Sequence, residues 1–300
     1  MVACGDARSD SAKGDPVQYA RDIRLVTLSG TRDLRESSGA AASHRQSGVV
    51  FTINDSDNSA TLFALDTTGA DRGTWRVSGP SNSDWESLSL GPCEDATRDC
   101  LYIGDTGDND GARPSRSIYR TAEPDAKGRR DVVFAERLRY VYADGPHDVE
   151  AMYVARNGDI FFITKRPLLD SARLPRPALV FSLPAKAWQK ETRAVAQLVD
   201  SLPPIVPGGQ ALMLVTDAAL SPDGRHLVVR TYTQAYVFAT DTVSGRINHS
   251  IAPRVCQLES LGEPQGEGVS WLNNAGRMAF TSEGNAQPLR LASCDLPRDD

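Results

Sequence analysis

Short apolar runs rich in β-branched and aromatic residues recur along most of the chain, and polar turns separate them. This pattern predicts β-strands, and helical periodicity is almost absent. A short polar segment precedes five of the apolar runs, most clearly Asp-Trp-Glu at 84–86 and Asp-Val-Glu at 148–150. Each polar segment opens one strand, and the apolar runs that follow are expected to be strands at 49–54, 101–105, 160–165, 227–231 and 278–283. The chain therefore repeats one unit, a pair of strands, five times.

The repeats are expected to cover 37–79, 84–143, 148–200, 215–251 and 266–294. A period of about 48 to 67 residues built from short strands is typical of a β-propeller. The strand expected at 23–28 precedes the first repeat and is placed to close the ring against the last one. We therefore predict an all-β propeller of five blades closed by an N-terminal strand. The alternative is six blades, with the additional one in 201–214 or 251–264.

The first 17 residues differ from the rest of the chain, because they are rich in Gly, Asp, Ser and Lys and lack strand patterns. Such a composition is typical of a flexible tether. The sequence Val-Ala-Cys-Gly at 2–5 resembles the end of a bacterial lipobox, which makes Cys4 a candidate lipidation site. We expect residues 18–300 to form a single propeller domain. Its contact with a membrane would be through that lipid anchor alone, since no apolar run reaches the roughly 18 residues of a spanning helix.

Four further cysteines indicate the compartment. Cys93 and Cys100 flank a polar turn between two expected strands, where a disulfide is geometrically natural. A bridge between Cys256 and Cys294 would tie the fourth repeat to the end of the fifth. Two disulfides predict an extracytoplasmic protein, periplasmic or at the cell surface. The alternative is buried free thiols in a cytosolic protein.

The formal charge excludes one class of partner. The net charge is −6, and the densest basic run, at 127–130, holds only three cations. A protein that binds nucleic acid through the phosphate backbone needs clustered Lys and Arg. We therefore expect no nucleic-acid partner.

A propeller brings the first residues of each inner strand and the last residues of the adjacent strand to one mouth of the central channel. The repeat alignment assigns to this mouth the inner-strand residues Glu86, Glu150, Asp217 and Glu267, and the second-strand residues Asn54, Asp105, Lys165, Arg230 and Glu283. Like charges about 8 Å apart cost about 2 kcal/mol per pair at an effective dielectric constant of about 20. Oxygen ligands from several strands suit Ca²⁺. The four inner-strand acids are therefore predicted to bind a divalent cation, with Asn54, Asp105, Lys165 and Arg230 contacting a ligand. The alternative is a ring of salt bridges and water in which Lys165 and Arg230 neutralise their neighbours.

Two further features are candidates for chemistry. The segment 105–111, Asp-Thr-Gly-Asp-Asn-Asp-Gly, resembles a calcium loop without the EF-hand spacing, and the alternative is a turn whose acids cap their own backbone. His147 is the one histidine near the expected mouth, and a hydrogen-bonded structural role is its alternative. If the protein is an enzyme, His147 or Glu283 is the expected general base. Trp85 points opposite to its neighbours on the strand and is expected in the core between blades.

Two motifs resemble those of known propellers. The turn Ser-Pro-Asp-Gly-Arg at 221–225 is similar to turns of TolB-like and WD-repeat propellers. The inner-strand acids resemble those of gluconolactonase-like and paraoxonase-like propellers. The resemblance to the gluconolactonase-like enzymes implies a divalent cation at the channel centre held by Glu, Asn and Asp. Here the matching positions are nearly all carboxylates, with Ser38 in the first repeat.

Two functions follow from these residues. The first is a small-molecule pocket over a cation, in a metal-dependent hydrolase of lactones, esters or phosphoesters. The second is a non-catalytic lipoprotein that binds a protein or a glycan through one face. The mixed charges at the mouth favour a pocket, and the absence of a Gly-x-Ser-x-Gly nucleophile motif favours the second function.

Overall fold

A computed structural model of the chain describes residues 18–30, 33–127, 129–165, 171–172, 176–189, 193–202 and 214–297. Strands dominate this part of the chain, and the helices in it are two short 3₁₀ turns, η1 (Ala185–Gln189) and η2 (Glu259–Leu261). None of its helices has the length and apolar character needed to cross a membrane. The lipidation candidate Cys4 lies outside the described residues.

The strands form five consecutive units, each an antiparallel meander in most of its pairings. The first contains β3 (Ser37–Ala42), β4 (Val49–Asn54), β5 (Thr61–Asp66) and β6 (Asp71–Ser78); the second contains β7 (Trp85–Pro92), β8 (Asp99–Asp105), β9 (Arg116–Ala122) and β11 (Glu136–Tyr142). The third contains β12 (Val149–Val154), β13 (Ile160–Thr164), β14 (Ala178–Leu183) and β15 (Ala194–Leu202); the fourth contains β16 (Val215–Leu220), β17 (His226–Thr231), β18 (Gln234–Ala239) and β19 (Arg254–Gln257). The fifth contains β20 (Gly266–Trp271), β21 (Arg277–Ser282) and β22 (Leu289–Ser293), and β2 (Arg21–Val26) completes it.

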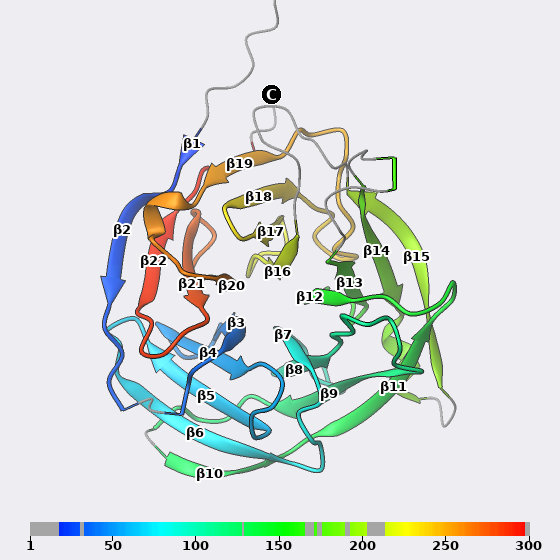
Figure 1. The fold of residues 1–300 in the computed structure, drawn as a ribbon, viewed down its shortest axis with the longest axis horizontal. Coiled ribbons are helices and arrows are strands. Elements are labelled where there is room, and N and C mark those ends of the chain that lie inside the picture. Colours follow the sequence, from blue (N-terminus) through cyan, green and yellow to red (C-terminus); the bar gives the residue numbers. More distant parts are fainter. Residues whose placement is uncertain are drawn as a thin grey trace, which may run out of the picture.

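The first strands of these units surround a common centre. Strands β3, β7, β12, β16 and β20 contact one another in cyclic order, and Figure 1 shows them at the middle of the ring. The predicted all-β propeller is therefore confirmed. The segment 251–264 forms β19 and η2 and is not a further blade. Because 203–213 lies outside the described residues, the number of blades in the whole chain stays a prediction.

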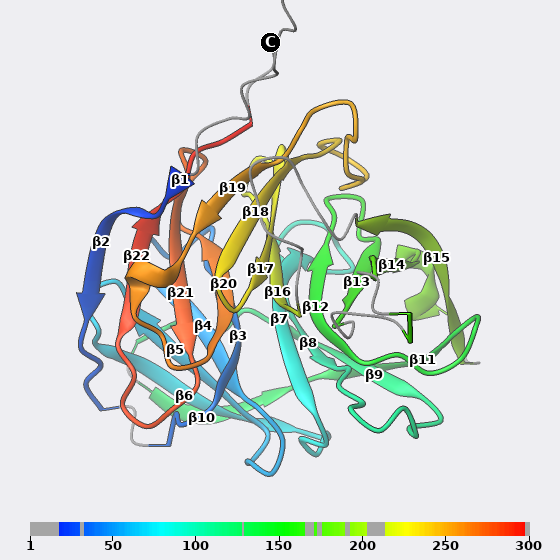
Figure 2. The same ribbon diagram turned by 45° about the horizontal axis from the view of Figure 1, so that its top comes forward.

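The N-terminal segment closes the ring, as predicted, but it serves two blades. Strand β2 pairs antiparallel with β22, whereas β1 (Gln18–Tyr19) pairs in parallel with β19 of the preceding blade. Two other parallel pairs join neighbouring blades at the outside. Strand β10 (Arg129–Phe134) lies along β6, and β11 lies along β15 (Figure 2).

The core lies between the blades, where apolar side chains of adjacent units pack together. Trp85 is fully buried and tilts against Tyr119, with 6.1 Å between the ring centroids, in a cluster that also holds Phe51 and Trp75 of the first unit. The expected core position of Trp85 is confirmed. This packing fixes where each inner strand begins, and the start of each inner strand carries the candidate site.

Both predicted disulfides are present. Cys93–Cys100 spans the β7–β8 turn with 5.0 Å between the Cα atoms, and Cys256–Cys294 joins β19 to the residue after β22 with 5.8 Å. The second bridge therefore fastens the two blades that the N-terminal segment also connects. These disulfides are compatible with an extracytoplasmic protein.

Candidate functional site: the acidic channel mouth

The register of every inner strand shifts at the same place. The ladder of each inner strand with its neighbour is interrupted between 37 and 39, 85 and 87, 149 and 151, 215 and 217, and 266 and 269. The residues inside the first four interruptions are Ser38, Glu86, Glu150 and Thr216. The fifth interruption holds two residues, Glu267 and Gly268. A bulge leaves its extra residue out of the ladder and turns the side chain in a new direction. The five positions are thus equivalent, and we call them the bulge residues.

The ends of the second strands meet these bulges, as predicted. Ser37 pairs with Asn54, and the corresponding pairs in the next units are Trp85 with Asp105, Val149 with Thr164, Val215 with Thr231, and Gly266 with Ser282. The residue after each second strand continues the pairing in at least three blades. The N–H of Asp55 donates to Glu36 O at 2.9 Å, that of Lys165 to Asp148 O at 3.1 Å, and that of Glu283 to Gln265 O at 3.0 Å.

We define the channel mouth by three sets of residues that this register makes equivalent. They are the bulge residues Ser38, Glu86, Glu150, Thr216 and Glu267; the residues before the inner strands, Glu36, Asp84, Asp148, Leu214 and Gln265; and those after the second strands, Asp55, Thr106, Lys165, Tyr232 and Glu283. Eight of these carry carboxyl groups, and among them only Lys165 carries a cation. The mouth is therefore strongly acidic.

Asp217 is not at the position predicted for it, because Thr216 is the bulge residue of the fourth blade. Asp217 is fully buried, and its two carboxylate oxygens accept hydrogen bonds from the N–H groups of Ala218 and Val269, each at 2.8 Å. Burial raises the pKa of Asp217 well above its ordinary value, although these backbone donors oppose the rise. Asp217 thus joins β16 to β20 and is not available as a cation ligand.

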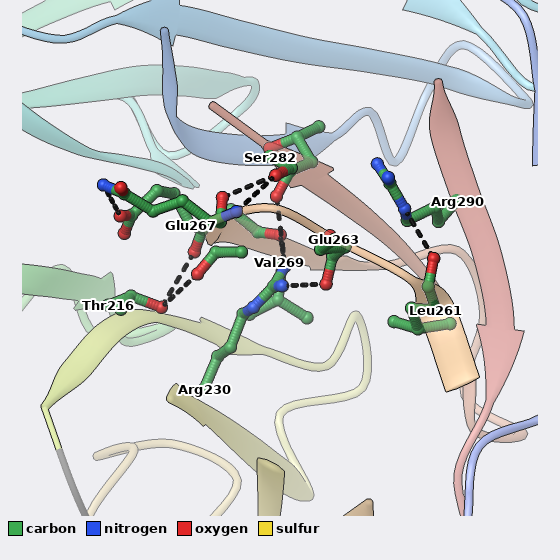
Figure 3. A network of polar contacts seen from close by, with 12 residues as sticks. Thr216, Arg230, Leu261, Glu263, Glu267, Val269, Ser282 and Arg290 are labelled. Atoms are coloured by element: carbon green, nitrogen blue, oxygen red, sulfur yellow. Dashed lines mark hydrogen bonds and ion pairs between the residues drawn. The ribbon is translucent and has the colours of Figure 1, made fainter. Parts of the chain in front are cut away.

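Arg230 is likewise not a ligand-facing residue at the mouth. It is fully buried and forms an ion pair with Glu263, and its Nη1 donates to Gly268 O at 2.6 Å and to Thr281 O at 3.2 Å (Figure 3). Its guanidinium lies 5.3 Å from the centre of the Phe280 ring. Arg230 therefore cross-links the fourth and fifth blades.

Asn54 and Asp105 also have structural partners. The Asn54 amide oxygen accepts hydrogen bonds from the N–H groups of Arg35 and Glu36, at 3.1 and 3.2 Å, and its amide nitrogen donates to Asp33 O at 2.7 Å. Asp105 is buried and bonds Arg113 Nη2 at 2.5 Å. Of the predicted ligand-binding residues, Lys165 is thus the one that this register places at the mouth, and its contact with a ligand stays a prediction.

The segment 105–111 is fastened by arginines. Asp108 is buried, pairs with Arg116, and accepts the N–H of Ala112 at 3.0 Å. Its own N–H donates to Asp148 at 2.8 Å. Because Asp105 and Asp108 face arginines and backbone donors, this geometry favours the capped turn over the calcium loop.

Lys165 forms an ion pair with the buried Glu150, and its charge also acts on the buried Glu267. Its Nζ lies 2.8 Å from Glu150 Oε1 and 5.8 Å from the centre of the Tyr232 ring. Burial raises the pKa of Glu150 to about 8 although Lys165 opposes it, and burial raises that of Glu267 to about 7 although Gln265, which donates to Glu267 Oε1 at 2.9 Å, opposes it. Burial lowers the pKa of Lys165, but Glu150, Tyr232 and Glu267 together outweigh burial and raise it. Protons and the Lys165 cation thus relieve part of the charge.

Three carboxyl groups of the mouth converge more closely than the rest. Asp55, Asp84 and Glu86 each place an oxygen within 4.8 Å of the other two. Glu86 is only 5% exposed, and no described residue donates a hydrogen bond to its carboxylate or to that of Asp84. Burial, followed by the charge of Glu150, raises the pKa of Glu86, and burial, followed by Asp55, raises that of Asp84 to about 6. We call Asp55, Asp84 and Glu86 the acidic triad.

The two candidate bases differ in their surroundings. His147 packs against Tyr142 and Phe181, with ring centroids at 5.1 and 4.7 Å, and its Nε2 is 2.9 Å from Asp144 Oδ1. These contacts favour its structural role. Glu283 is half-buried, and burial, then the charges of Asp55 and Glu36, raise its pKa. Glu283 is thus the candidate base that lies at the mouth.

Comparisons with known proteins agree with the β-propeller fold. No family model and no curated protein matches the sequence. The structure is similar to a luciferin-regenerating enzyme (8% identity, 93% of this chain and 97% of that chain covered, TM-score 0.49) and to streptogramin B lyase (11% identity, 92% and 73% covered, TM-score 0.40). It is also similar to a β-propeller domain from Myceliophteria thermophila (13% identity, 91% and 99% covered, TM-score 0.42). Structural neighbours of this chain are thus β-propellers that include enzymes.

Proposed function

We propose that the channel mouth binds a divalent cation, Ca²⁺ by its oxygen chemistry, through the acidic triad. The observation that carries this proposal is the carboxylate of Glu86, which is buried, has no donor among the described residues, and is aimed at two further carboxylates. A buried ionised group without a partner is costly, and a cation or a proton must compensate it. Calcium accepts 6–8 oxygen ligands in flexible geometry, so three side chains would leave positions for water and for a ligand.

The cation site and its neighbours would form a small-molecule pocket with hydrolytic activity. A bound cation polarises a carbonyl or phosphoryl oxygen. Burial raises the pKa of both Asp55 and Glu283, and the charge of Lys165 opposes part of that rise, so Lys165 lies near both groups in charge terms. Its ammonium group can bind an anionic part of a substrate. Glu283 can accept a proton from an attacking water. Lactones, esters and phosphoesters are the substrate classes that this set of groups can process.

Calcium titration of the purified protein tests the cation. We expect millimolar Ca²⁺ to raise the melting temperature of EDTA-treated protein, because a ligand that binds only the folded state stabilises it by about 2.7 kcal/mol at roughly 100-fold saturation. Glu86→Gln and Asp84→Asn should abolish this rise. Glu259→Gln, which changes an exposed carboxylate on η2, should retain it. A rise that survives in both triad variants would contradict the proposal.

A substrate screen tests the pocket. Wild type should hydrolyse at least one lactone, ester or phosphoester, and Glu283→Gln and Lys165→Met should fold normally but lose that activity. If the wild type is inactive although calcium binds at the triad, the hydrolase part of the proposal fails and the cation site stands.

A protein-binding role is the second candidate, and one surface favours it. Phe134 is 81% exposed on β10, which is the last strand of its sheet among the described residues. An edge strand with an exposed aromatic residue is suited to pair with a partner's strand. Capture of a partner by wild type but not by Phe134→Ser, together with an inactive mouth, would favour this role.

We also propose that the protein works outside the cytoplasm, with Cys4 as a lipid anchor. The two disulfides support the compartment. Fractionation of the native host, followed by mass spectrometry of the N-terminal peptide, should find the protein in the envelope fraction with a lipid on Cys4. Recovery of unmodified Cys4 from the cytosol would refute this.

A further inference from the structure

Lys165 is the one cation among the residues of the channel mouth, and its ammonium group is bonded inside the acidic set. Its Nζ donates to Glu150 Oε1 at 2.8 Å, and its side chain is 19% exposed. Glu150 is buried, and among the described residues Lys165 supplies the one hydrogen bond to its carboxylate. The bulge glutamate of the third blade is therefore compensated by an ammonium group of the same chain.

The charge of Lys165 acts on more than this one partner. Burial raises the pKa of six carboxyl groups at the mouth, and the positive charge of Lys165 opposes part of the rise at each of them. The six are Asp55, Glu86, Asp148, Glu150, Glu267 and Glu283. These groups come from the first, second, third and fifth blades. The ammonium group thus serves most of the mouth and not only its ion-pair partner.

The surroundings of this ammonium group resemble those of a bound metal ion. Glu150 and Glu267 are bulge residues that are 2% and 3% exposed, and the charge of Glu267 acts on Glu150. The ring centre of Tyr232 lies 5.8 Å from Lys165 Nζ. Buried carboxylates are ligands of hard cations, and hydrolases with two ions hold them about 3.5–4 Å apart to grip the oxygens of the substrate. At this mouth an ammonium group occupies a position that suits such an ion.

We propose that Lys165 takes the place of a second cation, so that the mouth binds a single divalent ion at the acidic triad. This inference rests on the proposed cation site and deepens it. An ammonium group has three N–H donors, and Lys165 uses one of them for Glu150. The others remain for an anionic oxygen of a ligand, although an ammonium group provides no metal-bound water. The pair of charges therefore suits a carboxylate or phosphoryl group held between the ion and Lys165.

Removal of the charge at Lys165 tests this inference through the metal stoichiometry. The full chain is treated with EDTA, exchanged into buffer at pH 9, where protons compete least with a metal, and titrated with Ca²⁺ by calorimetry. We expect one ion per chain in the wild type and in Lys165→Arg, which keeps the charge, but two ions in Lys165→Met. Lys165→Gln keeps a donor for Glu150 without a charge and should also bind two ions. Thermal melts establish that each variant is folded, and Lys165→Gln replaces Lys165→Met if the latter is not.

Terbium luminescence locates the additional ion. Tb³⁺ binds to oxygen ligands as Ca²⁺ does, and a nearby tyrosine excites its luminescence with an efficiency that falls steeply with distance. An ion in the place of Lys165 Nζ would lie beside the ring of Tyr232. The luminescence that Lys165→Met gains over wild type should therefore be lost in Lys165→Met/Tyr232→Leu, and also in Lys165→Met/Glu150→Gln, which lacks a ligand. A gain that persists in both double variants would place the ion elsewhere and contradict the inference.

The outcomes separate this inference from the cation site on which it rests. One ion in wild type and in the two uncharged variants alike, or two ions in wild type, would overturn the inference and leave the acidic triad as a cation site. No ion in wild type but one in Lys165→Met would overturn the triad site and support the exclusion of a cation by Lys165. No ion in any of these proteins would overturn both.

Discussion

Replacement of Glu267 by glutamine should change how the stability of the protein depends on pH. The side chain is 3% exposed at the channel mouth, and burial raises its pKa from 4.5 to about 7. Between these two values the folded protein holds a proton that the unfolded chain has released. A state that binds more protons loses relative stability as pH rises, so Glu267 destabilises the metal-free protein increasingly from about pH 4.5 to pH 7.

The size of this effect follows from the two pKa values. Each pH unit of difference corresponds to about 1.4 kcal/mol, so the wild type should lose about 3 kcal/mol through Glu267 across this window. Glutamine has the same shape, does not titrate, and keeps an oxygen for the amide of Gln265. The free energy of unfolding of Glu267→Gln should therefore fall by about 3 kcal/mol less than that of wild type between pH 4 and pH 8.

Urea unfolding in EDTA buffer at several pH values measures this difference. Glu259→Gln serves as the control, since its carboxylate is exposed on η2 and outside the mouth. Identical pH dependence in Glu267→Gln and wild type would refute the reasoning. It would mean that water or another cation reaches the bulge residue and keeps its carboxylate solvated.

Three further predictions concern other parts of the molecule. The stabilisation by calcium should be much smaller at pH 5 than at pH 8, because burial raises the pKa of Asp84 to about 6 and at pH 5 a cation must displace its proton. Scanning fluorimetry at both pH values checks this, and equal calcium-induced shifts of the melting temperature would contradict it. Replacement of both cysteines by serine should destabilise the protein by about 4 kcal/mol for the Cys256–Cys294 bridge and by about 2 kcal/mol for the Cys93–Cys100 bridge. The reason is the length of the loop that each bridge closes, with sequence separations of 38 and 7. Chemical denaturation that ranks the two variants in the opposite order would count against this. Gly266→Ala should lower the free energy of unfolding by more than about 2 kcal/mol, because a Cβ there would lie 1.8 Å from Nη2 of the fully buried Arg230 and would disturb its ion pair with Glu263. A melting temperature like that of wild type would show that the pair can move.

The sequence was sufficient to predict the ring and the place where its polar ends meet. Short apolar runs separated by polar turns predict a meander, and the acidic repeat marks where each inner strand begins. In the fourth blade the repeat alignment was wrong by one residue, because it placed Asp217 at the bulge position that Thr216 occupies. Each bulge adds a residue that the two-residue period of a strand does not contain, so a repeat alignment has no local signal for where that residue is placed.

The sequence analysis also misplaced the ends of some second strands. The residue after the second strand lies at the mouth, so Asp55 takes the position assigned to Asn54, one residue earlier, and Tyr232 takes the position assigned to Arg230, two residues earlier. Asp84 precedes Glu86 by two residues in the acidic repeat, and this spacing was the available signal for it. The parallel pairs at the outside, such as β10 with β6, could not be predicted, because exposed strand edges select a partner by main-chain hydrogen bonds rather than by side-chain pattern.

The shared closure of two blades by one segment has a consequence for how the chain reaches its native state. Strand β2 pairs with β22, so the fifth blade is completed by residues from opposite ends of the described chain. Contacts between such distant residues carry a large loop-closure entropy and form slowly. We expect blades made of neighbouring strands to assemble during synthesis, whereas the seam between the fourth and fifth blades forms last. Until then β22 exposes an unpaired edge, so this seam is where a newly made chain is most exposed to misassembly with another copy.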